Sequence, residues 1–297
     1  EVDGIQYIRM IRPGSDFRTL DLQSYLQNYC EHLIETVRRE RPAFLVGASN
    51  FMNGLAATIV ARQFGIPSIY EVRGVWEVTR LSRQPSWADS EECRMLMRLE
   101  TQACLAADAV VVITEAVKAE LVRRGVPAGK ISVISNGVDI DRFSPSSVDS
   151  ELKGSLGLEG KTVIGFIGSF VEYEGLDILL RAFKVLLTSR ERDDIGLLLV
   201  GDGTHMQTLK SLCTELKLDQ HVIFTGRVPH GDIKRYYSIC DMICLPRRGL
   251  PVCEMVSPLK PFEAMAMGTP LIVSDVAALA EIMRDGDIGL LHRKDDV

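Results

Sequence analysis

Residues 162–200 read TVIGFIGSFVEYEGLDILLRAFKVLLTSRERDDIGLLLV, and this stretch indicates the fold class. Two short apolar runs, 162–167 and 195–200, enclose a longer amphipathic segment. Strands that alternate with helices in this way form βαβ units, whose strands lie parallel in one sheet. The stretch therefore predicts an α/β fold built on a parallel sheet.

The same alternation continues on both sides of this unit. The helix expected after residue 20 places apolar residues at steps of three and four on one face, from Leu22 to Val37. Thr114 is expected to cap a later helix. Further strands are expected at 5–10, 44–46, 68–72, 109–113, 131–134, 222–224, 242–245, 271–273 and 289–291.

The length of 297 residues suits two domains. A polar stretch rich in Ser and Gly, residues 139–161, interrupts the pattern and marks the expected boundary. We therefore predict two facing, doubly wound, Rossmann-like domains, at residues 1–145 and 146–297. Such domains bind ligands at the carboxyl ends of their strands and enclose a cleft between them.

Composition excludes several other classes of protein. With 46% hydrophobic and 25% charged residues the chain is typical of a soluble globular protein, and its net charge of −6 argues against a broad nucleic-acid-binding surface. The seven cysteines lack zinc-site spacing, and most are expected to be reduced core residues. Without an apolar run of roughly 20 residues or a signal pattern, the expected localisation is cytoplasmic, and peripheral contact with the inner face of the membrane stays open.

The loops after the strands of the second half carry the functional signal. They read FIGSFVEYEG (166–175), VGDGTH (200–205), TGRVPH (225–230) and LPRRGLPVCEMVSPLKPFEAMAMG (245–268). Together with VISNGVDIDRF (133–143), PFEAMAMGTPLIVSDV (261–276) and EIMRDGDIGLL (281–291), they resemble family 4 of the retaining GT-B glycosyltransferases.

The resemblance implies transfer of a sugar from a UDP- or GDP-linked donor to an acceptor, with retention of anomeric configuration and no bound metal or cofactor. It implies a role in polysaccharide, glycolipid or glycoconjugate assembly, with a glycan, lipid or small molecule as acceptor. Measured against the family, the N-terminal domain is expected to be incomplete. Two alternatives stay open: a nucleotide-sugar epimerase, and a catalytically degenerate GT-B module that serves binding or scaffolding.

The resemblance assigns Glu263 to the ribose hydroxyls of the donor, a contact that an ionised carboxylate suits. It places Arg227 and Val228 beside the base. The family's other glutamate lies eight positions before the first, where this chain has Met255. Glu254, one position further back, is the candidate for that role, and the backbone of residues 256–260 is the alternative.

Two cations that the family directs at the donor diphosphate are missing, because Ser169 and Glu174 stand in their places. Arg247, Arg248 and Lys260 are the candidate replacements. A lysine in the first turn of a helix opposes the helix dipole, and rules of this kind are broken mostly at functional sites. The alternative for Lys260 is a side chain that points into water.

The sequence around Lys260 also predicts a helix. Ser257 is expected to cap a helix that runs to Gly268, because prolines fit its first turn. Its amino end, with Leu259, would bind an anion at the carboxyl edge of a strand, and Gly168 is a further candidate for donor binding.

The first half contributes further candidates. Arg73 stands where the family commonly has a histidine that faces the transferred sugar, and it is expected to contact phosphate or an acceptor carboxylate. The alternative is an interdomain salt bridge. Asn136 and Gly137 resemble the family's hinge, and Asp202 is expected to form a turn.

Overall fold

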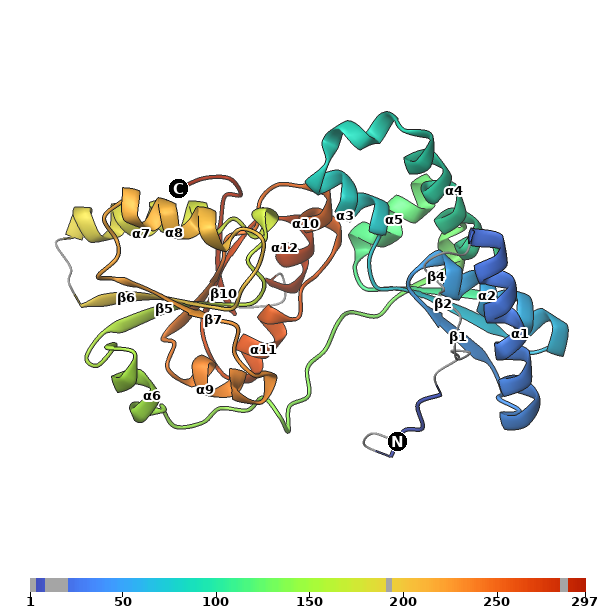
Figure 1. Cartoon of the computed structure of the whole chain (residues 1–297), viewed down its shortest axis with the longest axis horizontal. Coiled ribbons are helices and arrows are strands. Elements are labelled where there is room, and N and C mark those ends of the chain that lie inside the picture. Colours follow the sequence, from blue (N-terminus) through green and yellow to red (C-terminus); the bar gives the residue numbers. More distant parts are fainter. Residues whose placement is uncertain (1–3, 9–20, 191–193, 284–287) are drawn as a thin grey trace. The chain divides into compact units, whose positions relative to one another are not determined.

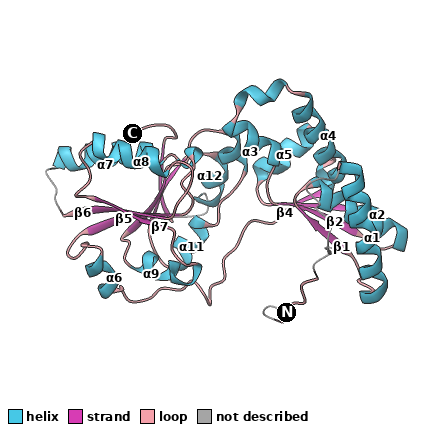
Figure 2. Cartoon of the chain, viewed as in Figure 1, coloured by secondary structure: helices cyan, strands magenta, loops and turns pink. Residues whose placement is uncertain are grey.

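Parallel sheets flanked by helices carry both halves of the chain (Figure 2). The computed structural model describes residues 4–8, 21–190, 194–283 and 288–297. It divides into unit 1, Glu1–Glu77 with Ser86–Ile134, and unit 2, Val78–Pro85 with Ser135–Val297. The predicted boundary between residues 145 and 146 stays a prediction.

Unit 1 is built on a four-stranded sheet in the order β1-β2-β3-β4, with every pair parallel. The strands are β1 (Leu45–Ala48), β2 (Ser68–Val72), β3 (Ala109–Val112) and β4 (Ile131–Val133). The helices are α1 (Leu22–Glu40), α2 (Phe51–Phe64), α3 (Trp76–Arg83), α4 (Glu91–Ala106) and α5 (Glu115–Arg123), of which α3 continues into the segment assigned to unit 2.

Helix α2 packs closely on this sheet because Gly54 leaves room for an aromatic ring. A Cβ atom on Gly54 would lie 2.6 Å from the ring of Tyr70. Helix α4 packs against α2 in turn. The close approach brings α2, α4 and β2 together around a buried carboxyl group.

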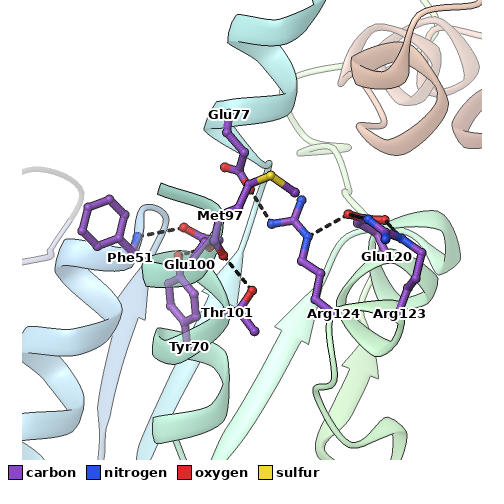
Figure 3. Close-up of polar contacts among 9 residues, drawn as sticks. All are labelled: Phe51, Tyr70, Glu77, Met97, Glu100, Thr101, Glu120, Arg123 and Arg124. Atoms are coloured by element: carbon purple, nitrogen blue, oxygen red, sulfur yellow. Dashed lines mark hydrogen bonds and ion pairs between the residues drawn. The ribbon is translucent and has the colours of Figure 1, made fainter. Parts of the chain in front are cut away.

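That carboxyl group belongs to Glu100 of α4 (Figure 3). It accepts hydrogen bonds from the backbone N–H of Phe51, at 3.1 Å, and from the hydroxyl of Tyr70. Burial raises the pKa of Glu100 to about 7, although both hydrogen bonds oppose the shift. Nearby, Arg124 pairs with Glu77 and with Glu120, so a polar network links the helices of unit 1.

Unit 2 is built on a six-stranded parallel sheet in the order β10-β9-β8-β5-β6-β7. In chain order within the unit, read from β7, this is the doubly wound order 3-2-1-4-5-6, whose switch point lies between β5 and β8. The strands are β5 (Thr162–Ile167), β6 (Ile195–Val200), β7 (Val222–Gly226), β8 (Met242–Leu245), β9 (Leu271–Ser274) and β10 (Gly289–His292).

Helices cover both faces of this sheet, with α7 and α8 on one face and α9 and α11 on the other (Figure 1). The sheet is strongly apolar where it is covered, and all six residues of β6 are buried. The helices are α6 (Ser150–Ser155), α7 (Leu176–Arg190), α8 (Met206–Glu215), α9 (Ile233–Ser238), α10 (Pro251–Met255), α11 (Lys260–Ala266) and α12 (Ala277–Met283).

Most of the predicted elements are confirmed. Four strands match their predicted bounds, and six others end within two residues of them. Thr114 caps α5, because its hydroxyl accepts from the N–H of Val117. The strand predicted at 5–10 is wrong for residues 5–8, where Ile5 forms only an isolated bridge, and residues 9 and 10 lie outside the described residues.

The cysteines also follow the sequence. All seven cysteines are free, and six are buried. Among the described residues, no helix combines the length and the apolar character that a membrane span requires. No group of three or more His, Cys, Asp or Glu in the same ranges is arranged to hold a metal ion.

Candidate functional site

A cleft of about 710 Å³ lies in unit 2 at the carboxyl ends of the strands. The loops after β5, β6 and β7 line it, together with the start of α11. This is the switch point, where doubly wound sheets bind their ligands. The structure brings together seven of the residues predicted for the donor site: Gly168, Ser169, Arg227, Val228, Leu259, Lys260 and Glu263.

The loops after β5 and β6 form one wall of the cleft and touch through their backbones. A Cβ atom on Gly201 would lie 1.9 Å from the carbonyl oxygen of Gly168, so only glycine allows this approach. The N–H of Phe170 donates to the carbonyl of Asp202 at 2.9 Å. The carboxylate of Asp202 accepts from the next N–H, as a turn-forming residue does.

The other wall contains Pro258, Leu259 and the start of α11, and the helix predicted from Ser257 to Gly268 is shorter than expected. Helix α10 ends at Met255 and α11 begins at Lys260, with Leu259 as its N-cap residue and no side-chain cap. The predicted cap at Ser257 is therefore wrong. Proline 258 disfavours helical backbone at the residue before it. Ser257 is buried and accepts hydrogen bonds from the side chain of Asn136, through its carbonyl at 2.9 Å and its hydroxyl at 3.1 Å.

A buried cluster of three charges lies between the two walls. Glu174, in the short 3-10 turn Glu172–Glu174, is 4% exposed. Its Oε2 lies 2.8 Å from Nζ of Lys260, and its Oε1 lies 3.3 Å from Nη2 of Arg247. Lys260 is therefore not a side chain that points into water, which was the alternative to a role in the site. Its ammonium group also lies 4.6 Å from the ring centre of Phe166.

Glycine at position 168 makes room for this lysine. A Cβ atom there would lie 2.2 Å from Cε of Lys260. Burial alone would raise the pKa of Glu174, but Lys260 and Arg247 together hold it below its ordinary value. Burial lowers the pKa of Lys260, and Glu174 opposes that shift. The carboxylate is therefore ionised at neutral pH.

Arg247 supports this cluster from below the cleft surface, since it does not line the cleft. Its Nη1 donates to the carbonyl of Val256 at 2.7 Å, and its guanidinium lies 5.8 Å from the ring centre of Tyr173. The contact with Val256 also fixes the segment between α10 and α11. Arg247 thus links the loop after β8 to the turn after β5 and to the segment between α10 and α11.

Two of the predicted residues are engaged outside the cleft lining. Arg248 pairs with Asp177 at 2.6 Å. Glu254 accepts from Nζ of Lys294 at 2.5 Å and from the backbone N–H of Ala277, the first residue of α12, at 2.7 Å. Both side chains therefore have structural partners, and the roles predicted for them stay predictions.

Glu263 lines the cleft and is held by a neighbour that the sequence did not reveal. The hydroxyl of Tyr237 donates to its Oε2 at 2.8 Å. Burial and the charge of Glu263 raise the pKa of Tyr237 well above its ordinary value, so the tyrosine is a neutral donor. This bond orients the Glu263 carboxylate in the cleft.

The remaining candidates are not among the residues of unit 2 that line the cleft. Arg73 belongs to unit 1, where it is 64% exposed and pairs with Glu71 of the same strand end at 2.8 Å. Asn136 contacts Ser257, as described, while a Cβ atom on Gly137 would meet nothing within 4 Å. The hinge at these two residues stays a prediction.

Sequence reasoning missed the ion pair between Glu174 and Lys260 although both residues drew attention. In the sequence alone, Glu174 is a lost cation and Lys260 is an added cation, and their spacing does not pair the two residues. One signal could have paired them: a negative charge replaces a family cation at Glu174, and an extra positive charge appears at Lys260 in the same predicted site. Tyr237 and Phe166 offered no such signal, because an aromatic residue in a predicted strand or helix is mostly a core residue.

Family comparisons cover nearly the whole chain. Residues 148–297 match the family described as glycosyl transferases group 1, and residues 1–137 match the glycosyl transferase 4-like domain. D-inositol 3-phosphate glycosyltransferase from Rhodococcus opacus is 26% identical over 295 residues, which cover 94% of this chain and 64% of that protein. GDP-mannose-dependent alpha-(1-6)-phosphatidylinositol monomannoside mannosyltransferase from Mycolicibacterium smegmatis is 26% identical over 64% of this chain and 50% of its own length. The chain spans less than two thirds of the length of these relatives.

Solved structures agree with the predicted fold class. Anabaena Alr3699/HepE, solved in complex with UDP, has a TM-score of 0.74 at 20% identity, with 90% of this chain and 68% of that chain covered. Sucrose-phosphate synthase from Thermosynechococcus elongatus has a TM-score of 0.73 at 23% identity, with 93% and 67% covered. The α/β fold with two parallel sheets of the GT-B kind is confirmed.

Proposed function

Because the chain belongs to the group 1 glycosyltransferases, we propose that it transfers a sugar from a nucleotide-diphosphate sugar to a hydroxyl-bearing acceptor, with retention of anomeric configuration. Members of this family are retaining enzymes that depend on nucleotide sugars. The observation that carries the proposal is the cleft of unit 2, which joins a carboxylate and an ammonium group at the switch point of the sheet.

Each wall of the cleft has a part in donor binding. Glu263 accepts hydrogen bonds from the two ribose hydroxyls, and its bond from Tyr237 fixes the carboxylate for this contact. Arg227 and Val228 lie beside the base. The backbone at Gly168 and Ser169 and the ammonium of Lys260 face the diphosphate.

Lys260 is the proposed catalytic cation. Negative charge grows on the leaving nucleoside diphosphate as the glycosidic bond breaks, and a fixed cation stabilises that charge more in the transition state than in the ground state. The pair with Glu174 keeps the ammonium in place before the donor arrives. In unit 1, Arg73 is proposed to meet phosphate or a carboxylate of the acceptor.

The proposed donor carries UDP or GDP. A solved relative of this fold binds UDP-glucose, and a curated relative is named for its dependence on GDP-mannose. The proposed acceptor is a glycan, a lipid or a small molecule in polysaccharide, glycolipid or glycoconjugate assembly. Relatives named for inositol phosphate and for phosphatidylinositol mannoside support a hydroxyl of a polyol or sugar.

Thermal unfolding with nucleotides tests donor binding. A ligand at about 100 times its dissociation constant stabilises the native state by about 2.7 kcal/mol. We expect UDP or GDP to raise the melting temperature and uridine or guanosine, which lack the diphosphate, to raise it far less. A flat response to every nucleotide would favour the degenerate binding or scaffold module instead.

The Glu263→Ala variant tests the ribose contact. Two charge-assisted hydrogen bonds of about 1.5 to 3 kcal/mol each predict a loss of at least tenfold in kcat/KM for the nucleotide sugar. Glu215→Ala, at an exposed glutamate of α8, is the matched control. Wild-type kinetics in a folded Glu263→Ala variant would remove Glu263 from the donor site.

A further inference from the structure

A carboxylate buried beside a site for an anionic ligand costs electrostatic free energy, so its presence in the cleft needs a physical explanation. Glu174 lines the cleft and is almost fully buried. Its negative charge repels a diphosphate, and its burial costs solvation free energy. Both costs would vanish with a neutral residue at this position.

The contacts of Glu174 indicate what the carboxylate does. One oxygen faces Nζ of Lys260 and the other faces Nη2 of Arg247, so each cation has its own acceptor. The three charges leave a net charge of +1, from two cations and one carboxylate. Without the carboxylate, two like charges would share a buried space.

Of the two cations in the cluster, only Lys260 reaches the cleft. Lys260 lines the cleft whereas Arg247 does not. The side chain of Lys260 crosses the backbone at Gly168, where no Cβ atom interferes, and ends between Glu174 and the ring of Phe166. An ammonium group has three N–H donors, so one contact with Glu174 leaves donors for a phosphate oxygen.

We propose that Glu174 is a positioning residue of the donor site, which holds Lys260 charged and directed into the cleft so that its ammonium group meets the donor diphosphate. This inference rests on the proposed function of the cleft. Arg247 is the second cation of the cluster and holds the loop beneath it. The site thus carries its anion-binding charge on α11, with the counter-charge on the turn after β5.

The charge state of Lys260 gives this role a signature that a purely structural role would lack. Burial and Arg247 both lower the pKa of the lysine, and Glu174 is the strongest opposing influence. Cys253 of α10 is a further titratable group that acts on it, and Tyr173, Asp202, Arg227 and Glu263 line the same cleft. Removal of the Glu174 charge therefore makes the ammonium lose its proton at a lower pH.

The test is the pH dependence of UDP and GDP binding, measured by calorimetry from pH 6 to pH 9. In Glu174→Gln the alkaline loss of binding is expected to begin at a lower pH than in wild type, so that on that limb the variant binds about tenfold more weakly. Glu172→Gln, an exposed glutamate of the same turn, is the control and should follow wild type. Ionisation of the nucleotide itself is common to all variants and cancels in the comparison.

The charge-swapped variant Glu174→Lys with Lys260→Glu keeps the inference testable if Glu174→Gln does not fold. The swap preserves a pair of opposite charges, so it should bind nucleotide at least tenfold more tightly than Lys260→Glu alone. Equal binding by these two variants, or an unshifted alkaline limb in a folded Glu174→Gln, would overturn the role of Glu174. If wild type binds neither nucleotide, the proposed function itself fails.

Discussion

Two buried glutamates, one in each unit, have pKa values displaced in opposite directions. Glu100 of unit 1 is 2% exposed and Glu174 of unit 2 is 4% exposed. Burial favours the protonated form of both. Glu100 faces a tyrosine hydroxyl and a backbone N–H, and its pKa rises to about 7. Glu174 faces two cations, and its pKa falls below the ordinary value.

Burial, with the negative charge of nearby Glu77, outweighs the two neutral hydrogen-bond donors at Glu100, whereas two full positive charges outweigh burial at Glu174. The surroundings of each residue match its place in the molecule. Glu100 ties α4 to α2 and β2 in the core of unit 1, where a protonated carboxyl can satisfy its neighbours. Glu174 lies at a cleft that needs a fixed ammonium group.

The largest expected effect comes from a change that makes the surroundings of Glu174 resemble those of Glu100. Lys260→Ala removes one of the two cations and leaves a buried carboxylate partly unpaired. Loss of one partner from a buried ion pair costs about 3 to 5 kcal/mol of folding free energy. Loss of the cation at the diphosphate is expected to lower kcat by a factor that corresponds to about 2.7 to 4 kcal/mol.

Urea unfolding and steady-state kinetics measure these two losses separately. Lys210→Ala, at an exposed lysine of α8, is the control and should change neither. An unaffected kcat in Lys260→Ala would remove Lys260 from the diphosphate site and leave Arg247 or Arg248, after a change in the loop that holds them, as the candidate cation. If Lys260 replaces the two cations that the family carries at positions 169 and 174, then adding Ser169→Arg and Glu174→Lys to Lys260→Ala should partly restore kcat.

A smaller effect is expected from Glu100 as the pH changes. Its pKa is raised in the folded state, so its contribution to stability is fully present below the ordinary value of 4.5 and is lost as pH rises through about 7. At 1.36 kcal/mol per pH unit, that interval corresponds to roughly 3 kcal/mol. Glu100→Gln, whose amide can donate to Tyr70 and accept from Phe51, should remove this part of the pH dependence.

Tryptophan fluorescence isolates this measurement, because both tryptophans of the chain, Trp76 and Trp87, belong to unit 1. Urea unfolding between pH 4.5 and pH 8 should show wild type losing stability relative to Glu100→Gln as the pH rises. Glu91→Gln, an exposed glutamate of the same helix, should follow wild type. Parallel curves for wild type and Glu100→Gln would mean that Glu100 is ionised throughout.

The sequence predicted the architecture more fully than the chemistry of either glutamate. Hydrophobic periodicity located nearly every strand, because a buried parallel strand is apolar along its whole length, as β6 shows. Glu100 drew no attention, since a glutamate within an amphipathic helix is mostly solvated. Only the packing of α4 on α2 makes it a buried group.

The candidate site divides in the same way. The residues that line the cleft could be named because parallel strands bring the loops at their carboxyl ends together. The partner of each charge could not, because Glu174 and Lys260 are distant in sequence and meet only through the order of β5 and β8 in the sheet. The start of α11 was misplaced because Ser257 suits a cap by type and is engaged instead by Asn136, and α10 was not predicted.

The smallest expected effect compares the two tyrosines that hold carboxyl groups, one in each unit. Tyr70 donates to Glu100 and Tyr237 donates to Glu263. Replacement of either by Phe removes one hydrogen bond and should cost about 0.5 to 1.5 kcal/mol of stability.

Only Tyr237→Phe frees a carboxylate that lines the cleft, so it alone should raise KM for the nucleotide sugar, by about twofold to tenfold, with kcat nearly unchanged. Tyr70→Phe, measured in the same assay, provides the matched comparison. Equal kinetics in the two variants would mean that the bond from Tyr237 supports the fold of α9 and α11 and does not orient Glu263 for the donor.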